Sequence, residues 1–345
     1  MSGLRLSVLD QSPVPEGSTG SGALQNTLDL ARLADDLGYT RYWVSEHHGG
    51  PSLAGPSPEA LIGPIAASTS RLRVGSGGVM LPHYSPFKVA ETFSLLAGLF
   101  PGRIDLGLGR ASGTDPLTTF ALQRDRTKAM PDDFPQQLAE LLAYLTDTMP
   151  PGHPFARLAG SLPGRPEVPE VWLLGSSPQS AVWAAELGLP YAFADFINPR
   201  GAEIAQDYRR RVVEAGGEPR LIVCSWIVCA DSDEEARRLA ASSRMSLTLL
   251  RRGRLIEVPP PEKALRFLEH EGLLDGDGES GGRRWIVGTP GGVREQVEAL
   301  VRDYGADEVM AVTITYDHGA RRRSYELLAE AFGLARSGGA PRAAA

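Results

Sequence analysis

The sequence predicts one (β/α)8 barrel, an α/β fold of the TIM-barrel class, with insertions. Short apolar runs alternate with segments that repeat apolar residues at helical spacing, which is typical of βα units around a parallel sheet. Eight such runs occur, a number that favours a closed barrel over a doubly wound sheet. The first run leads into Asp10-Gln11-Ser12-Pro13, which is not the glycine fingerprint of a dinucleotide-binding sheet.

Each expected strand is followed by an expected helix. The strands cover residues 4–9, 40–46, 72–81, 103–109, 170–175, 190–194, 220–229 and 308–315. The helices cover residues 23–37, 58–69, 86–99, 132–147, 178–187, 200–215, 232–250, 291–304 and 319–333. Gly38, Gly188 and Gly216 follow three of these helices, at the position where glycine commonly ends a helix.

Two stretches interrupt this rhythm. Residues 148–169 are rich in proline and glycine, and residues 251–289 contain three successive prolines, a short expected helix at 262–271 and a glycine-rich run at 272–282. Insertions of this length are lids, subunit contacts or disordered loops, and for 251–289 we keep both a mobile lid and an oligomer contact open. We expect the barrel domain to span residues 1–335 and residues 336–345 to be a disordered tail.

Composition narrows the class of protein. The chain has 345 residues, a formal net charge of −7 and 42% hydrophobic residues, which allows a large core and argues against nucleic-acid binding through a basic surface. No signal segment or membrane-length apolar run is present, so we expect a cytoplasmic protein with no membrane partner. Cys224 and Cys229 lie five apart in one strand-like run, so we expect them on opposite faces and not bridged.

Residues 103–112, Arg-Ile-Asp-Leu-Gly-Leu-Gly-Arg-Ala-Ser, are the most informative stretch. Alternation puts the isoleucine and leucines on one face of a strand, and Asp105, Gly107 and Gly109 on the other. Glycine weakens a strand, so two on one face indicate close approach by a ligand or by another backbone. Arg110 follows at the carboxyl end, where barrel enzymes keep their sites.

A second segment, Gly175 to Ser180, predicts a helix N-terminus. Ser177 is a good N-cap, Pro178 suits the first helical position, and exposed amides there attract anions such as phosphate. Ser176 and Ser180 add hydroxyl groups. The alternative is an ordinary capped helix that binds nothing.

Glu46-His47-His48 follows the second strand. Histidine and carboxylate are common metal ligands, but adjacent residues on a strand point to opposite faces, and the other histidines show no ligand spacing. We therefore expect no metal site and a single inward histidine that handles protons.

These segments together resemble the bacterial-luciferase-like flavin monooxygenases, a (β/α)8 superfamily that includes alkanal monooxygenase. The resemblance covers residues 4–333. It is carried by residues 43–48, 74–82, 103–110, 175–180 and 184–190, with 286–290 matching the wider superfamily. Gly109 stands where luciferase has its reactive cysteine, so the chain looks like the non-luminescent, single-subunit members.

The resemblance implies reduced FMN as the cofactor, bound over the barrel mouth. Its phosphate would contact the serines and two arginines, whose guanidinium groups can bond phosphate in a bidentate manner. The implied phosphate ligands are Ser176, Ser177, Ser180, Arg110 and Arg126.

For the flavin ring, the resemblance implies a backbone bend at Gly77-Gly78, often formed by a cis peptide bond. It also aligns His47 with a catalytic histidine of luciferase.

The implied function is a flavin-dependent monooxygenase that oxygenates a small organic substrate with reduced FMN and O₂. The partners would be a separate flavin reductase and a second copy of the chain, as a homodimer. The alternatives are a deazaflavin-dependent oxidoreductase that transfers hydride without O₂, a non-catalytic flavin-binding protein and a metal-dependent barrel hydrolase. We expect loops 111–131, 148–169 and 251–289 to shape the substrate pocket.

Overall fold

The computed structural model describes residues 3–110, 115–123, 126–127, 133–165, 167–274 and 285–335. The described residues form nine parallel strands: β1 (Arg5–Asp10), β2 (Arg41–Val44), β3 (Arg73–Met80), β4 (Ile104–Gly109), β5 (Glu170–Gly175), β6 (Tyr191–Ala194), β7 (Leu221–Cys229), β8 (Trp285–Gly288) and β9 (Glu308–Val312). Eight of them close a barrel in the order β1-β2-β3-β4-β5-β6-β7-β9, because β9 pairs with both β7 and β1. The predicted (β/α)8 fold is confirmed.

The extra strand, β8, was not predicted. It pairs with Trp226–Cys229 of β7, where β7 extends past its pairing with β6 at Leu221–Cys224. With only four residues, β8 is too short to show a periodic pattern, and its residues were expected to belong to the insertion at 251–289.

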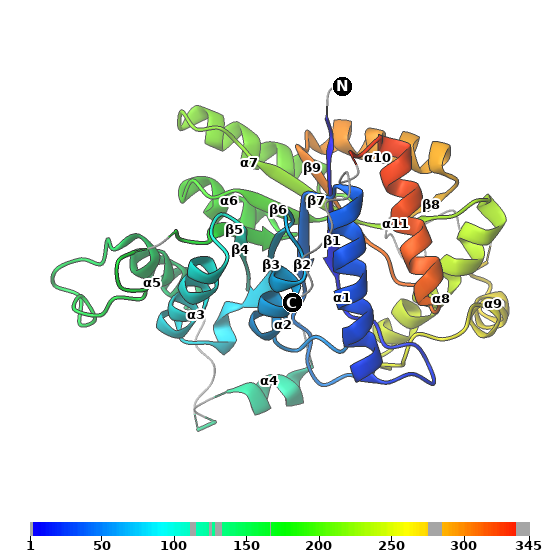
Figure 1. The fold of residues 1–345 in the computed structure, drawn as a ribbon, viewed down its shortest axis with the longest axis horizontal. Coiled ribbons are helices and arrows are strands. Elements are labelled where there is room, and N and C mark those ends of the chain that lie inside the picture. Colours follow the sequence, from blue (N-terminus) through cyan, green and yellow to red (C-terminus); the bar gives the residue numbers. More distant parts are fainter. Residues whose placement is uncertain are drawn as a thin grey trace.

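The helices cover the outside of the barrel (Figure 1). They are α1 (Gly20–Leu37), α2 (Pro58–Ala67), α3 (Pro86–Leu99), α4 (Pro116–Leu122), α5 (Phe134–Thr146), α6 (Pro178–Glu186), α7 (Ala202–Glu214), α8 (Asp233–Arg251), α9 (Pro261–His270), α10 (Pro290–Tyr304) and α11 (His318–Phe332), with a 3₁₀ turn η1 (Leu81–His83). Predicted and observed ends agree within three residues. Gly38, Gly188 and Gly216 all have positive φ just after helices, as expected.

Helix α4 was not predicted, because none of its residues is buried and no apolar face marks it in the sequence. Asp115 caps it by accepting hydrogen bonds from the N–H groups of Leu117 and Thr118. In Figure 1 it lies apart from the other helices, at the lower end of the barrel.

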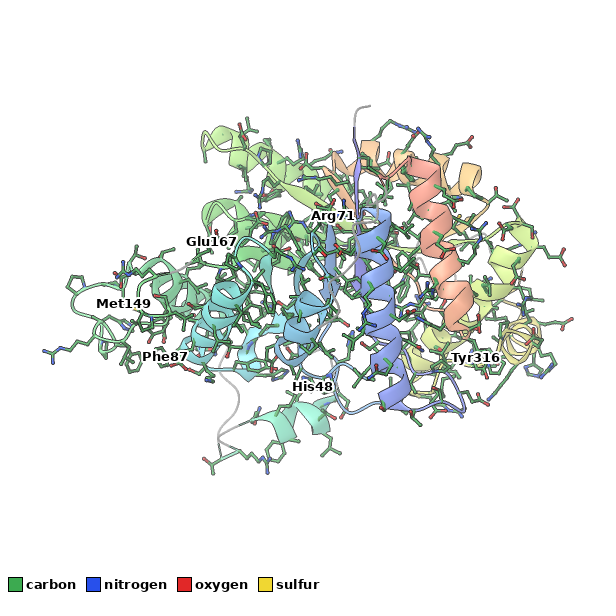
Figure 2. The ribbon with its side chains drawn as sticks, viewed as in Figure 1. His48, Arg71, Phe87, Met149, Glu167 and Tyr316 are labelled. Atoms are coloured by element: carbon green, nitrogen blue, oxygen red, sulfur yellow. The ribbon has the colours of Figure 1, made fainter. Side chains whose placement is uncertain are left out.

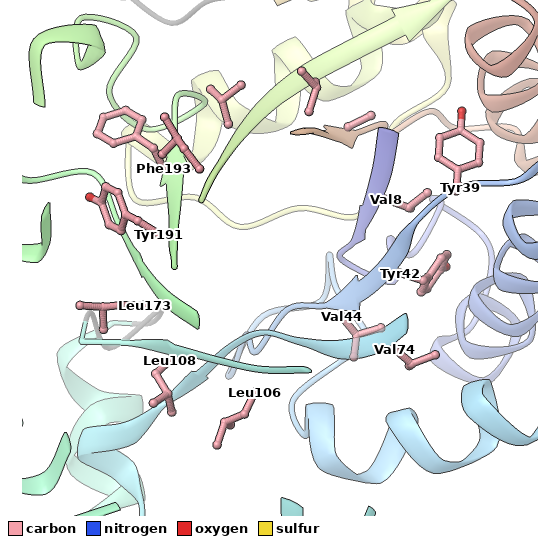
Figure 3. Packing of buried hydrophobic residues seen from close by; sticks show 14 of the residues in the cluster. Val8, Tyr39, Tyr42, Val44, Val74, Leu106, Leu108, Leu173, Tyr191 and Phe193 are labelled. Carbon is pink, nitrogen blue, oxygen red and sulfur yellow. The ribbon is translucent and has the colours of Figure 1, made fainter. Parts of the chain in front are cut away.

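Apolar residues form two separate layers around the strands. The outer layer packs strands against helices; it includes Val8, Leu106 and Leu108 (Figure 3). The inner layer fills the barrel with large side chains, among them Trp43 and Trp172. Burial of both layers is the main favourable contribution to folding.

The two cysteines illustrate the alternation between these layers. Cys224 belongs to the inner layer and Cys229 to the outer one, and both are unbridged and buried. The prediction of opposite faces is confirmed. Burial raises the pKa of both thiols, so neither is a reactive thiolate at neutral pH.

A buried ionic cluster closes the amino end of the barrel. The Arg41 guanidinium contacts Asp105 at 2.7 Å, Glu170 at 2.9 Å and Glu308 at 3.2 Å. Trp43 Nε1 donates to Asp105 at 2.9 Å, so the buried carboxylate is held by a neutral donor as well. Burial alone raises the pKa of Glu170, but Arg41, Arg220 and Arg73 outweigh it and lower the pKa to about 2.

The glycines of β4 face the barrel interior, as predicted. A side chain at Gly107 would collide with the Ser76 carbonyl oxygen and approach Leu174. Gly107 is thus required by the close approach of the neighbouring backbone, which is the plainer of the two explanations the sequence allowed.

The carboxyl ends of the strands lie at the lower side of the molecule in Figure 2. His48 and Tyr316, which follow β2 and β9, lie there, whereas Arg71, which precedes β3, lies toward the upper side. Helix α4 is on the same lower side. The predicted site segments after β2, β3, β4 and β5 therefore converge at one mouth of the barrel.

Candidate active site at the barrel mouth

The start of α6 carries the predicted serine cluster. The Ser177 hydroxyl accepts from the Ser180 N–H at 3.4 Å, and the Ser180 hydroxyl in turn accepts from the Ser177 N–H, which completes a capping box. The Ser180 hydroxyl also lies 2.8 Å from both the Ser177 carbonyl and the Tyr191 hydroxyl. Ser180 is therefore engaged within the protein, whereas Ser176 and Ser177 are half-buried at the mouth.

Arg110 is brought to the same helix. Its guanidinium carbon lies 5.6 Å from the ring centroid of Trp183, six residues along from the Ser177 cap. Arg110 is exposed, and no carboxylate among the described residues pairs with it. Arg110 thus packs on the second turn of the helix whose capped N-terminus carries the serines.

Arg126 is not brought to the serine cluster. Its guanidinium donates to the Ala121 carbonyl at 2.9 Å and lies 6.0 Å from the Phe120 ring centroid, so its described contacts are with α4. A residue that sequence reasoning missed, Asn198, is at the cluster instead, where its side-chain amide donates to the Ser176 carbonyl at 3.0 Å. Asn198 follows β6 in a loop without any motif, so the sequence held no signal for it.

The backbone at Gly77-Gly78 has the feature that the resemblance implied. The peptide bond between them is cis, and the β3–β4 register shifts by one residue there. A side chain on Gly77 would meet Leu9 at 2.6 Å, and one on Gly78 would meet the Gly107 carbonyl at 2.8 Å. At Gly78 the obstacle is backbone, so a larger residue would require β3 and β4 to move apart, whereas at Gly77 it is the end of the Leu9 side chain.

Both histidines of the Glu46-His47-His48 segment line one cavity, so the expectation of opposite faces was wrong. Strand β2 ends at Val44, and the alternation of a strand no longer applies three residues later. A backbone hydrogen bond from His47 to the Gly55 carbonyl, at 3.1 Å, holds this loop.

Glu46, which sequence reasoning did not single out for a role, connects the loop to β3. It is fully buried, accepts from the Met80 N–H at 2.9 Å and lies 2.8 Å from Nε2 of His48. One ring nitrogen of His48 is therefore engaged with a buried carboxylate. The ring of His48 meets that of His83 edge-on at 5.9 Å.

The cavity beside the histidines has a volume of about 520 Å³. Its floor consists of residues at or just beyond strand ends, and its side wall comes from α8 and from residues 253–258. Representative residues are Gln11, Phe196, Trp226, Ile314, Leu247 and Val258. A largely apolar cavity of this size with a few polar groups is typical of a small-molecule site.

Trp226 is a second functional candidate that the sequence did not reveal. It lies on β7, is 3% exposed, stacks on Trp285 at 5.3 Å and meets Phe196 edge-on. Its indole Nε1 is buried and has no hydrogen-bond partner among the residues that the structure describes. In sequence, an apolar strand residue of this kind cannot be distinguished from ordinary core.

Among the described residues, no group of three or more histidine, cysteine, aspartate or glutamate side chains is arranged to hold a metal ion. Within the same part of the chain, no helix combines the length and apolarity needed to cross a bilayer.

The structure thus defines a (β/α)8-barrel protein with the capped start of α6 and an apolar cavity at the carboxyl ends of the strands. A family model described as luciferase-like monooxygenase matches residues 4–308. The chain belongs to this family.

Individual relatives agree with that assignment. The YwcH protein of Bacillus subtilis (strain 168) is 48% identical over 333 residues, covering 95% of this chain and 98% of the relative. The N-acetyl-S-alkylcysteine monooxygenase of the same organism is 38% identical over 340 residues, covering 95% and 98%. The solved structure of apo-MsnO8 is 42% identical with a TM-score of 0.86, covering 96% of this chain and 98% of that one.

Proposed function

We propose that this protein is a flavin-dependent monooxygenase that uses reduced FMN and O₂ to oxygenate a small organic substrate. The observation that carries the proposal is that Arg110, which packs on Trp183 of the capped helix α6, lies at the same barrel mouth as the Gly77-Gly78 bend and the apolar cavity. The monooxygenase names of relatives support the reaction class.

The residues at the mouth fit FMN in charge and in shape. FMN carries a phosphate, and α6 presents exposed residues in its first turn, next to an arginine without a described carboxylate partner. Of the implied phosphate ligands, Arg110, Ser176 and Ser177 have the best-placed side chains. We keep Arg126 and Ser180 as weaker candidates, because Arg126 contacts α4 and the Ser180 hydroxyl is already engaged with Ser177 and Tyr191.

Each group at the mouth then has a definite task. Reduced FMN, when bound, supplies the electrons that activate O₂. Arg110 and the start of α6 bind the phosphate, and the Gly77-Gly78 backbone sets how closely the ring approaches β3. The apolar cavity excludes water, and His47 holds or delivers a proton at its imidazole ring.

The test is an anaerobic titration of the full chain with reduced FMN, followed by mixing with O₂ in a stopped-flow spectrometer. We expect stoichiometric binding and oxidation kinetics that differ from those of the unbound flavin, without a cofactor that must co-purify, since a separate reductase would supply it. Absence of flavin binding would overturn the proposal. Tight binding of a reduced deazaflavin, with hydride transfer that needs no O₂, would replace it with the oxidoreductase alternative.

A further inference from the structure

We infer that the Gln11 side chain binds the polar group of the substrate in the cavity at the barrel mouth, and that it selects a substrate with an apolar body and a primary carboxamide or lactam. The inference rests on the proposed function, because it names the substrate class of the same site. It depends on where Gln11 lies, on the open polar atoms of its side chain and on the charges of the cavity wall.

The direction of β1 brings Gln11 into the mouth. Leu9 belongs to the inner layer of the barrel, and Gln11 follows two residues later, just after the strand ends, and lines the cavity. Its strand pairs with β2 and β9, which lead to His47 and Ile314 on the same wall. Because Leu9 faces Gly77, a group bound to Gln11 lies next to the proposed cofactor subsite.

Hydrogen bonds hold the backbone on both sides of Gln11. The Asp10 carbonyl accepts from the Ser45 N–H at 3.0 Å, and the Ser12 carbonyl accepts from the Ala54 N–H at 2.9 Å. The Asp10 carboxylate also accepts from the Ser12 N–H at 2.7 Å. Little backbone freedom is therefore left to lose when the side chain binds a ligand.

The Gln11 side chain keeps its hydrogen-bonding capacity. The residue is only 8% exposed, yet its carboxamide forms no hydrogen bond with another described residue, and both its oxygen and its nitrogen remain accessible from the cavity. One edge of a carboxamide presents an acceptor beside a donor. A primary carboxamide or a lactam presents the complementary pair, whereas a ketone satisfies only the donor and a carboxylate sets an oxygen against the Gln11 oxygen.

The charges of the cavity wall favour a neutral polar group. Among the described lining residues there is no lysine or arginine, whereas Asp115 contributes a carboxylate. His47 and His48 also line the cavity, and an imidazolium can pair with an anion. The buried Glu46 carboxylate, 2.8 Å from Nε2 of His48, would balance the charge of that ring. A carboxylate substrate would thus meet Asp115 as well as His47, whereas a neutral carboxamide meets no opposing charge.

Four probes with one naphthalene body test the inference: 2-naphthamide, 2-acetonaphthone, 2-naphthoate and 2-ethylnaphthalene. The ketone replaces the NH₂ of the amide by a methyl group, so the two have nearly the same shape. Dissociation constants are measured by equilibrium dialysis at pH 8 on the full chain, with and without FMN. The naphthoate should bind at least about tenfold more weakly than the amide.

The decisive variant is Gln11→Met, which keeps the length of the side chain and removes its polar atoms. The amide-to-ketone affinity ratio should fall about three- to tenfold, the worth of one neutral hydrogen bond. Ser246→Ala is the matched control on the same wall. Its hydroxyl donates to the Ser242 carbonyl at 3.1 Å, so its removal should leave the ratio at the wild-type value.

A second measurement applies if Gln11→Met does not fold. The wild-type chain and Gln11→Asn are labelled with ¹⁵N-glutamine, and the side-chain NH₂ signal that is absent from Gln11→Asn belongs to Gln11. This signal should move with 2-naphthamide and stay in place with 2-ethylnaphthalene.

An unchanged ratio in Gln11→Met, or no selective shift of the Gln11 signal, overturns the role of this residue. Naphthoate that binds as tightly as the amide overturns the neutral class, and loss of that binding in His47→Ala would assign it to the imidazole. If FMN competes with 2-naphthamide and binds more weakly to Gln11→Met, Gln11 contacts the cofactor and the inference is wrong. Failure of the proposed function reads out differently: the probes would bind as described while the chain fails to bind FMN.

Discussion

Arg110 places a positive charge beside the first turns of α6, and we expect it to be the strongest single side-chain contributor to FMN affinity. A charge-assisted hydrogen bond contributes about 1.5–3 kcal/mol, so Arg110→Ala should weaken FMN binding about ten- to a hundredfold. Fluorescence titration with FMN measures this loss. Arg110→Lys should recover only part of it, because an ammonium group lacks the planar fork of arginine.

The matched control is Arg302→Ala, which removes an exposed arginine from the outer helix α10 and should leave FMN affinity unchanged. Arg126→Ala should have a smaller effect than Arg110→Ala, since Arg126 contacts α4 and not α6. Wild-type affinity in Arg110→Ala would remove this residue from the phosphate subsite.

His47 and His48 allow a second comparison between single residues. His47→Ala should leave FMN affinity near wild type and slow turnover about 10²- to 10⁴-fold, the range for loss of a general acid or base. His48→Ala should slow it less, because one ring nitrogen of His48 is engaged with buried Glu46. Single-turnover kinetics with saturating reduced FMN separate the two variants, and equal losses in both would contradict His47 as the proton carrier.

The segment 253–258, which forms part of the cavity wall, can be displaced by removing one backbone hydrogen bond. The N–H of Val258 donates to the Val14 carbonyl, and the Val258 carbonyl accepts from the Glu16 N–H, both at 2.8 Å. Val258→Pro removes the donated bond and should displace residues 253–258 from the mouth. We expect several-fold less product per O₂ consumed, measured with an oxygen electrode and product analysis, with FMN affinity retained.

Val258→Ala is the control for this change, because it keeps the N–H and removes only two methyl groups from the wall. Its coupling of O₂ use to product should stay close to wild type. If Val258→Pro dissociates an oligomer and leaves coupling intact, the segment is a subunit contact and not a lid. The glycine-rich run 272–282 lies mostly outside the described residues, and the tail 336–345 lies wholly outside them, so those predictions remain open.

Elements with a buried apolar stripe were predictable from sequence, and elements without one were not. Helix α3 was placed with its observed ends, because Val89, Ala90 and Phe93 mark its buried face. Helix α4 has no buried residue, and β8 has only four residues. Neither therefore shows in the sequence the regular repeat of apolar residues from which a helix or strand is predicted. Asp115-Pro116 was nevertheless an N-terminal helix signal, and it would have revealed α4.

The candidate site divides in a similar way. Ser177 and Arg110 each follow a strand whose end is marked by turn residues. Because all strands of the barrel are parallel, both residues could be placed at the same mouth from the sequence. The shared cavity of His47 and His48 was missed because the end of β2 is not visible in the sequence. Trp226 was missed as a cavity residue because an apolar residue inside a strand looks like ordinary core in the sequence.

At the scale of the whole molecule, the ionic cluster at the amino end joins strands from all around the barrel. Arg41 on β2 contacts carboxylates on β4, β5 and β9, and it lies over the ring of Trp172 at 4.7 Å. A cluster that spans the barrel ties its stability to the ionisation of these carboxylates.

Glu170 makes this dependence measurable. Its folded pKa is about 2 against an ordinary value of 4.5, since Arg41, Arg220 and Arg73 outweigh the opposing effect of burial. A lowered pKa contributes stability that is present above pH 4.5 and is lost as the pH falls toward 2. Glu170→Gln lacks this contribution, so its melting temperature should lie about 1–3 °C below wild type at pH 7. The gap should narrow as the pH falls from 4.5 to 3 and close only near pH 2.

Circular dichroism melts from pH 3 to pH 7 measure this gap. Glu269→Gln, on the exposed side of α9, is the matched control, and its melting curve should follow wild type at every pH. A gap for Glu170→Gln that stays constant across the range would mean that the side chain stabilises the barrel by packing or by neutral hydrogen bonds. In that case the charge of Glu170 would add no stability to the folded protein, and protonating it would cost none. The ionic cluster would then not determine how sensitive the fold is to acid.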